Sequence, residues 1–417
     1  MSTSDWTSAY FGTITAEEEE RLLQEVAQQL SQTSSFRDLV DVDSLLPRAR
    51  QAVVQTAARM KLSLAPDTAA ALSERAAARV GGLGFLVPFF RRDDISEIAL
   101  NPDGSLWVLP KGQRDFVPAQ ADLEPNEVWR AVEALLRPMG RALSEASPTV
   151  DGKLPRIETL PGLRGGARVK VLHPSIVPSR AGYPSINIRL FEPVPVTPER
   201  VVAWGVAPQI VIKQLLQAVR DGLRVLVCGG TASGKTTLLS ALTAGIPPDA
   251  RVVKIEDPEE IWMQHPNVVT IEARPALPGS SVAPYTIANG VDDALRMAPR
   301  WLIVGEVRTG DAAMALFRAQ MSDHPGLSTF HAESPQHAVE RMSLIMFADS
   351  HVPAAAAKGI FAQAVDLVVQ LGWADGRRCI TTVAEVSRQL KGGDVVFNPL
   401  YEIGAEEMTP PSIRRTV

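Results

Sequence analysis

The sequence has 417 residues, 45% of them hydrophobic and 21% charged, which is the composition of a folded chain too long for a single core. Its formal net charge of −5 gives no general basic surface for nucleic acid, and its two cysteines argue against a disulfide framework. No apolar stretch reaches the ~18 residues of a membrane span, and the N-terminus lacks the parts of a signal peptide. We therefore expect a cytoplasmic protein that contacts membranes only through partners.

Residues 1–80 are expected to form a helical extension. Thr15 and Glu18 have the spacing of a capping box, and the apolar residues that follow recur at helical spacing. Two more helices are expected near Val42–Ala58 and Thr68–Ala78.

A mixed α/β domain is expected over residues 81–192, beginning at Gly81-Gly82. Prolines, Pro193 first, then indicate a stiff linker over residues 193–205 with a helix start at Thr197-Pro198. The expected elements of the domain are strands at Ile95–Asn101, Leu106–Leu109, Arg168–Leu172 and Ser185–Leu190, and a helix at Pro125–Leu136.

Residues 206–417 alternate apolar strands with helical segments, the pattern of a parallel sheet. A hairpin is expected near the end of the chain, turning at Gly392-Gly393. The expected strands are Val225–Cys228, Val252–Ile255, Val268–Glu272, Leu302–Val304, Leu327–Thr329 and Leu367–Leu371, with hairpin strands Arg378–Val386 and Val395–Phe397.

The first strand of this region leads into a glycine-rich loop and then a helix. Gly229-x-x-x-x-Gly234-Lys235-Thr236 is the phosphate-binding pattern in its required strand–loop–helix context. Backbone N–H groups and the helix N-terminus would hold the phosphates of ATP, Lys235 would reach the β- and γ-phosphates, and Thr236 would bind Mg²⁺. The predicted nucleotide-binding residues are Gly229, Gly230, Thr231, Ala232, Ser233, Gly234, Lys235, Thr236 and Thr237.

Hydrolysis also needs a carboxylate near this phosphate-binding loop, which we call the cradle (residues 229–236). Two acidic stretches supply candidates. IEDPEE places Glu256 directly after a strand, and WLIVGEVR ends another strand in Gly305-Glu306. Carboxyl ends of parallel strands lie beside the ligand crevice of an open α/β sheet. We predict that Glu256 and Glu306 share water activation and positioning of the metal, with Glu306 and Thr236 as metal ligands. The sequence leaves open which glutamate is the base, and Glu306 paired with Arg308 is the structural alternative.

Two of the six histidines, His324 and His331, bracket a further strand. His331 follows the strand and is predicted to contact or sense the γ-phosphate. A lone histidine is more often structural, and no ligand set with zinc spacing accompanies the pair.

In this order and spacing, the motifs resemble those of the secretion ATPase superfamily, which powers type II and type IV secretion and type IV pili. IEDPEE is similar to its Asp box, LRMAPRWLIVGEVR to its atypical Walker B motif, and HPGLSTFHAESPQHAVERM to its His box. The helical N-terminus, GLGFLVPFFRRDDISEIALNPDG and VVTIEARP most resemble the tight-adherence (Tad/Flp) pilus ATPases of CpaF type. The conjugation-type type IV secretion ATPase is the close alternative.

The resemblance implies an α/β fold: a RecA-like P-loop NTPase domain, an N-terminal mixed α/β (PAS-like) domain and the helical extension. It also implies a homohexamer docked on an inner-membrane platform protein, with ATP between the two domains. Arg168 and Arg189 match the arginines of the N-terminal domain that reach the phosphates in this family. Asp151-Gly152-Lys153, Leu190 and Asp323 depart from the family's pattern.

The function predicted from the sequence is a Mg²⁺-dependent ATPase motor at the cytoplasmic face of a pilus or secretion machine, with no direct contact to nucleic acid. Three alternatives remain open: a conjugation-type secretion ATPase, a RecA-like motor acting on nucleic acid, and a scaffold that senses nucleotide without hydrolysing it. The low aromatic content and acidic charge argue against the nucleic-acid motor.

Overall fold

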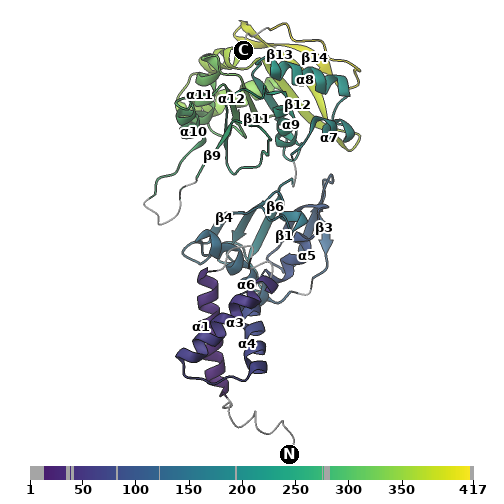
Figure 1. The fold of residues 1–417 in the computed structure, drawn as a ribbon. Helices are drawn as coiled ribbons and strands as arrows, with labels where there is room; N and C mark the ends of the chain where they lie inside the picture. Colours follow the sequence, from purple (N-terminus) through teal and green to yellow (C-terminus); the bar gives the residue numbers. More distant parts are fainter. Residues whose placement is uncertain are drawn as a thin grey trace, which may run out of the picture. The chain divides into compact units, whose positions relative to one another are not determined.

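The computed structural model describes residues 14–33, 38, 42–80, 83–121, 123–192, 195–274, 276 and 282–413. It divides into two compact units, Met1–Pro193 and Val194–Val417 (Figure 1). Several residues used above lie outside the described ones: segment 1–13, Gly81 and Gly82 at the predicted boundary, Pro193 of the linker and Pro275 of VVTIEARP.

Among the described residues, the N-terminal unit begins with the helices α1 (Ala16–Thr33), α3 (Val42–Arg59) and α4 (Pro66–Val80), which pack on one another and are coloured purple in Figure 1. The predicted capping box is present, because the backbone N–H of Glu18 donates to Thr15 Oγ1 at 3.2 Å and that of Thr15 donates to Glu18 Oε2 at 2.9 Å. Leucines and valines of the helices are buried at their contact.

Among the described residues, the strands of this unit form one antiparallel six-stranded sheet, in the order β3-β2-β1-β6-β5-β4. The sequence analysis did not identify β3 and β4. The elements are α5 (Val87–Phe90), β1 (Ile95–Leu100), β2 (Leu106–Pro110), β3 (Val117–Ala119), α6 (Pro125–Leu136), β4 (Thr149–Leu154), β5 (Ala167–Leu172) and β6 (Ser185–Leu190).

The three helices and the sheet share one hydrophobic core. Leu22 and Val53 from the helices belong to the same buried cluster as Ile98 and Val169 from the sheet. The helices α1, α3 and α4, which lie in the segment treated above as an extension, therefore fold as part of the unit that contains the sheet.

The C-terminal unit is built on an eight-stranded sheet with the order β14-β13-β12-β7-β11-β10-β8-β9. The pairs from β12 to β9 are parallel, and β13 and β14 add an antiparallel hairpin. The strands are β7 (Val225–Gly229), β8 (Val252–Glu256), β9 (Val268–Glu272), β10 (Trp301–Val304), β11 (Gly326–His331), β12 (Leu367–Ala374), β13 (Arg377–Lys391) and β14 (Asp394–Glu402).

Helices cover both faces of this sheet, which is why its central strands are apolar throughout (Figure 1). Val225 and Val227 of β7 pack with α8 and α9, whereas Leu226 and Cys228 pack in the second core with α10 to α13. Thr197 caps α7 as predicted. The helices are α7 (Pro198–Ala203), α8 (Gln209–Arg220), α9 (Lys235–Leu242), α10 (Ile287–Ala294), α11 (Gly310–Met321), α12 (Pro335–Ser350) and α13 (Ala354–Ala364).

Parallel pairing brings the carboxyl ends of β7, β8, β10 and β11 to one edge of the sheet. The predicted cradle and the residues predicted to activate water all follow these strand ends. Within the part of the chain that the structure describes, no helix combines the length and apolarity that a membrane span requires.

Candidate nucleotide site

The loop after β7 has the backbone geometry of a phosphate cradle. Ala232 and Gly234 have positive φ angles of 57° and 93°, and α9 begins immediately after them at Lys235. A β-carbon on Gly229 would lie 2.4 Å from Ser233 Oγ and 3.0 Å from a carbonyl oxygen of β12, so only glycine fits there. The loop thus presents the N-terminal end of α9 to an anion.

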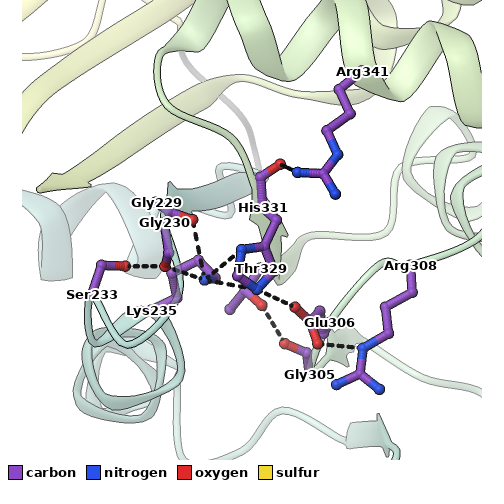
Figure 2. Close-up of polar contacts among 10 residues, drawn as sticks. All are labelled: Gly229, Gly230, Ser233, Lys235, Gly305, Glu306, Arg308, Thr329, His331 and Arg341. Carbon is purple, nitrogen blue, oxygen red and sulfur yellow. Dashed lines mark hydrogen bonds and ion pairs between the residues drawn. The ribbon is translucent and has the colours of Figure 1, made fainter.

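Lys235 lies inside this loop, with 7% of its surface exposed. Its ammonium donates to the carbonyl oxygens of Gly229 at 3.1 Å and Gly230 at 2.9 Å (Figure 2). It also lies 3.4 Å from Nε2 of His331. Two neutral carbonyl oxygens are weaker partners for an ammonium than phosphate oxygens, so a nucleotide would compete well for this side chain.

Glu306 follows β10 and lies between two basic side chains, as Figure 2 shows. Its Oε2 accepts a hydrogen bond from Nε of Arg308, and its Oε1 lies 3.2 Å from Nε2 of His331. His331 therefore links the cradle lysine to Glu306. Burial, then the charge of Lys235, lowers the pKa of His331, and the charge of Glu306 opposes this. The neutral ring can donate Nε2–H to Glu306.

The backbone at the end of β10 is fixed by β11. Thr329 Oγ1 donates to the carbonyl oxygen of Gly305 at 2.6 Å, and the N–H of Val307 donates to the carbonyl oxygen of Thr329 at 2.9 Å. These bonds hold Glu306 next to the strand that carries His331. Sequence reasoning missed Thr329 in this role, because a threonine within a strand is ordinary.

Glu256 ends β8 and is almost completely buried, with 1% exposed. Its Oε2 lies 2.7 Å from the ammonium of Lys254, also buried, and its Oε1 accepts the backbone N–H groups of Glu260 at 3.1 Å and Ile261 at 2.9 Å. Burial raises the pKa of Glu256, and Lys254 opposes that shift. The carboxylate therefore holds the acidic loop in place. The ion pair between Lys254 and Glu256 could not be predicted from the sequence, because Lys254 lies within an otherwise apolar strand.

Gly305 lies at the position before Glu306, where the usual Walker B motif has an aspartate. A β-carbon there would lie 2.9 Å from Cγ of Glu256. Glu256 thus occupies the space that a side chain at position 305 would need.

A cavity of about 590 Å³ opens beside the cradle. Thr236, Glu256 and Glu306 all line it, which brings the predicted metal ligands to one space. Hydroxyl and carboxylate oxygens suit Mg²⁺, which in nucleotide sites takes one or two protein ligands and completes its shell with phosphates and water. No group of three or more His, Cys, Asp or Glu side chains able to hold a metal occurs among the described residues.

His324 lies at the other end of β11 from His331. Its Nδ1 lies 3.0 Å from the carbonyl oxygen of Ala319, at the end of α11. This contact fits the structural interpretation of that histidine, and the structure does not bring it to the cradle.

Arg168 and Arg189 lie in the N-terminal unit, directly opposite each other on β5 and β6. Arg189 forms an ion pair with Glu97 at 2.7 Å, and Arg168 lies 3.8 Å from Asp151. Lys153 is paired with Arg168 on the next strand, so three basic residues cross the sheet in one row. The structure brings these arginines together with each other, and their contact with phosphate stays a prediction.

The fold and the cradle define a P-loop nucleotide-binding protein of the RecA-like class with an N-terminal domain. The family described as Type II/IV secretion system protein matches residues 127–391, more than half of the sequence. The chain belongs to this family.

Individual proteins are also similar to this chain. A putative conjugal transfer protein of Mycobacterium tuberculosis is 31% identical over 317 residues, which are 75% of this chain and 86% of that protein. An uncharacterized protein of Methanocaldococcus jannaschii is 35% identical over 208 residues, 49% of this chain, and the chain spans only 35% of that relative's length. The structure of the Legionella pneumophila ATPase DotB is similar in fold, with a TM-score of 0.50 at 17% identity over 73% of this chain and 80% of that one.

Proposed function

We propose that this protein is a Mg²⁺-dependent ATPase that converts ATP and water to ADP and phosphate and powers a pilus or secretion machine. The observation that carries the proposal is the contact series from Lys235 through His331 to Glu306, at the edge of the cavity that Thr236 also lines. It joins the cradle to a carboxylate that can orient water.

Each part of this series has a separate task. The amides of residues 229–237 and the ammonium of Lys235 bind the β- and γ-phosphates, and Lys235 exchanges two carbonyl oxygens for phosphate oxygens on binding. Mg²⁺, held by Thr236 and Glu306, would neutralise phosphate charge. His331 donates Nε2–H to Glu306 and so fixes the orientation of that carboxylate.

We assign the water-activating role to Glu306 and a positioning role to Glu256. Glu256 is enclosed by Lys254 and two backbone N–H groups, so its oxygens are already engaged. Glu306 is 21% exposed, and its partners are side chains that can move. A general base must reach the water that it deprotonates, which favours the more accessible carboxylate.

We further propose that the chain works as a homohexamer on the cytoplasmic face of the inner membrane, docked on a platform protein. Nucleotide would be held against Arg168 and Arg189, so that hydrolysis drives domain motion. The motifs favour assembly, or retraction, of a Tad-type pilus. The names of the conjugal transfer relatives favour a conjugation-type secretion machine, which is the second candidate.

The first experiment measures steady-state ATP hydrolysis with Mg²⁺ across protein concentration, with sedimentation of the same samples. Turnover that rises as hexamers form is expected. Lys235→Ala should abolish turnover while leaving the fold intact, as checked by circular dichroism.

Three results would contradict the proposal in different ways. Tight ATP binding by the hexamer without turnover would indicate a nucleotide-sensing scaffold. Turnover stimulated strongly by DNA would indicate a motor acting on nucleic acid. Normal turnover in Lys235→Ala would reject the assigned site altogether.

A further inference from the structure

The turn between β12 and β13 lies beside the phosphate cradle. β12 is paired with β7 as far as Leu371, and its last residues continue beyond the end of β7. There Trp373 is paired with Arg378 of β13, and the hairpin reverses through Asp375 and Gly376, both with positive φ. This is the geometry of a tight two-residue turn, and Trp373 and Arg378 form the second cross-strand pair away from it.

Arg378 points from this hairpin toward the cradle. A β-carbon on Gly234, the residue before Lys235, would lie only 3.7 Å from Cδ of Arg378. The guanidinium carbon lies over the ring of Trp373, 5.1 Å from its centroid, which is within the range of a cation–π contact. Among the described residues, no hydrogen-bond partner reaches the buried Nε of Arg378. A half-buried arginine with an unpartnered donor beside a phosphate cradle is a binding group without its ligand.

The order of the strands says which end of a nucleotide would reach this hairpin. Glu306 and His331 follow β10 and β11, on one side of β7, whereas β12 and β13 lie on its other side. If the γ-phosphate points to Glu306, a triphosphate laid across the cradle directs its α-phosphate and nucleoside toward Arg378.

We propose that Arg378, held in place by Trp373, is the surface on which the purine base of the nucleotide stacks. The base would lie on the guanidinium face opposite the indole, because planar guanidinium groups stack on aromatic rings. This inference rests on the proposed function, because it assigns the nucleoside end of the same site.

The test compares two ligands that share phosphates and differ in the nucleoside. Isothermal titration calorimetry would measure the binding of Mg·ATP and of Mg·tripolyphosphate to the full chain and to Arg378→Ala. We expect ATP binding to weaken about 5- to 150-fold, the range for losing one stacked base, while tripolyphosphate binding stays unchanged. The retained tripolyphosphate binding also shows that the variant is folded.

One further variant separates the planar shape of the Arg378 guanidinium from its charge, and another serves as a control for a neighbouring charge. Arg378→Lys keeps the charge but loses the plane, so it should bind ATP as weakly as Arg378→Ala does. Arg377→Ala removes an exposed neighbouring cation and should bind both ligands as the unaltered chain does. Arg378→Ala should also lose any preference for ATP over CTP, because a purine covers more of the guanidinium than a pyrimidine.

The outcomes are distinct. Equal weakening of ATP and tripolyphosphate would place Arg378 on a phosphate and overturn the inference, and so would unchanged binding of both. If the unaltered chain binds neither ligand, the proposed function itself fails. If the unaltered chain binds both and Arg378→Lys retains full ATP affinity, only the stacking role fails.

Discussion

Two clusters of charge lie at opposite ends of the central strand β7, and they are built differently. At its start, Arg224 and Asp366 form a buried ion pair, with side chains 2% and 0% exposed. Arg224 donates to both carboxylate oxygens, at 3.0 and 2.8 Å, and to the carbonyl oxygen of Gln320 at 2.6 Å. At the other end, Lys235, His331 and Glu306 are joined by contacts of 3.2 to 3.5 Å, and His331 is 33% exposed.

The contacts of the Arg224–Asp366 cluster are therefore permanent, whereas those of the Lys235–His331–Glu306 cluster can be exchanged for contacts with a ligand. The first cluster ties the starts of β7 and β12 to the end of α11, and both its charges are satisfied by short bonds that water does not reach. The second holds its groups loosely, each with a partner that a phosphate or a water molecule could replace. Stability should therefore depend on the first cluster and turnover on the second.

The largest expected effect on stability comes from Arg224→Ala. Removing the Arg224 guanidinium takes two short hydrogen bonds from the buried carboxylate of Asp366, which keeps the backbone N–H of residue 224 at 2.9 Å and Arg388 at 3.3 Å. Such a loss from a buried ion pair costs about 3–5 kcal/mol of unfolding free energy. Denaturant unfolding measures it. Arg388→Ala, which removes a half-exposed partner, should cost under about 1 kcal/mol. Comparable losses for both variants would mean that the buried pair is not the dominant contact.

In contrast to Arg224→Ala, Glu306→Gln should lower turnover and leave stability nearly unchanged. The amide keeps the size of the side chain but cannot accept a proton, so turnover should fall roughly 10²- to 10⁴-fold. Unfolding free energy should change by less than about 0.5 kcal/mol, as for other changes of accessible residues. Steady-state hydrolysis and denaturant unfolding of the same protein measure both. Glu333→Gln is the control, since that glutamate is exposed just after β11. A loss of stability without a loss of turnover would mean that the cluster around Glu306 contributes to stability rather than to turnover.

Gly305→Ala tests the close contact between the two strand ends near the cavity. The added methyl group would meet Cγ of Glu256 at 2.9 Å, and overpacking of this kind costs about 1–3 kcal/mol. Gly230→Ala is the matched control, because a methyl group added there would meet no atom within 4 Å. Thermal unfolding of the two variants should separate them. Equal transition temperatures would show that Glu256 can move aside.

Strands could be predicted from the sequence where their local residue pattern agrees with their burial in the tertiary structure. The apolar runs at β7, β8 and β10 are buried on both faces, so their composition identified them, and the motifs after them predicted the cradle and Glu306. Family membership confirms the superfamily predicted from those motifs. The CpaF-type assignment within it stays a prediction.

What the sequence could not supply depends on residues far apart in the chain. β4 was missed because Gly152 interrupts its pattern, and in the fold the side chain of Met139 occupies the space beside this glycine, with Sδ 2.2 Å from where a β-carbon would lie. β3 was missed because it contains Pro118, which only an edge strand tolerates. The contact between Lys254 and Glu256 likewise appears only once the acidic loop folds back under β8.

The smallest expected effect concerns the protonation of His331. Burial and Lys235 lower its pKa below the ordinary value of 6.5, although Glu306 opposes them. Below pH 6.5, then, the unfolded chain binds more protons at this histidine than the folded one, so stability decreases as the pH falls toward the folded pKa. His331→Gln keeps an N–H donor for Glu306 but does not titrate.

The advantage in unfolding free energy of the unaltered chain over His331→Gln should therefore shrink as the pH is lowered from neutral, as denaturant titrations at several pH values would measure. The change should be modest, because a third of the ring is exposed and solvent screens its charge interactions. An advantage that grows at low pH would mean that attraction to Glu306 outweighs burial and Lys235. His331 would then be a cation bound to Glu306, and its proposed role as a neutral donor linking the cradle to the carboxylate would be wrong.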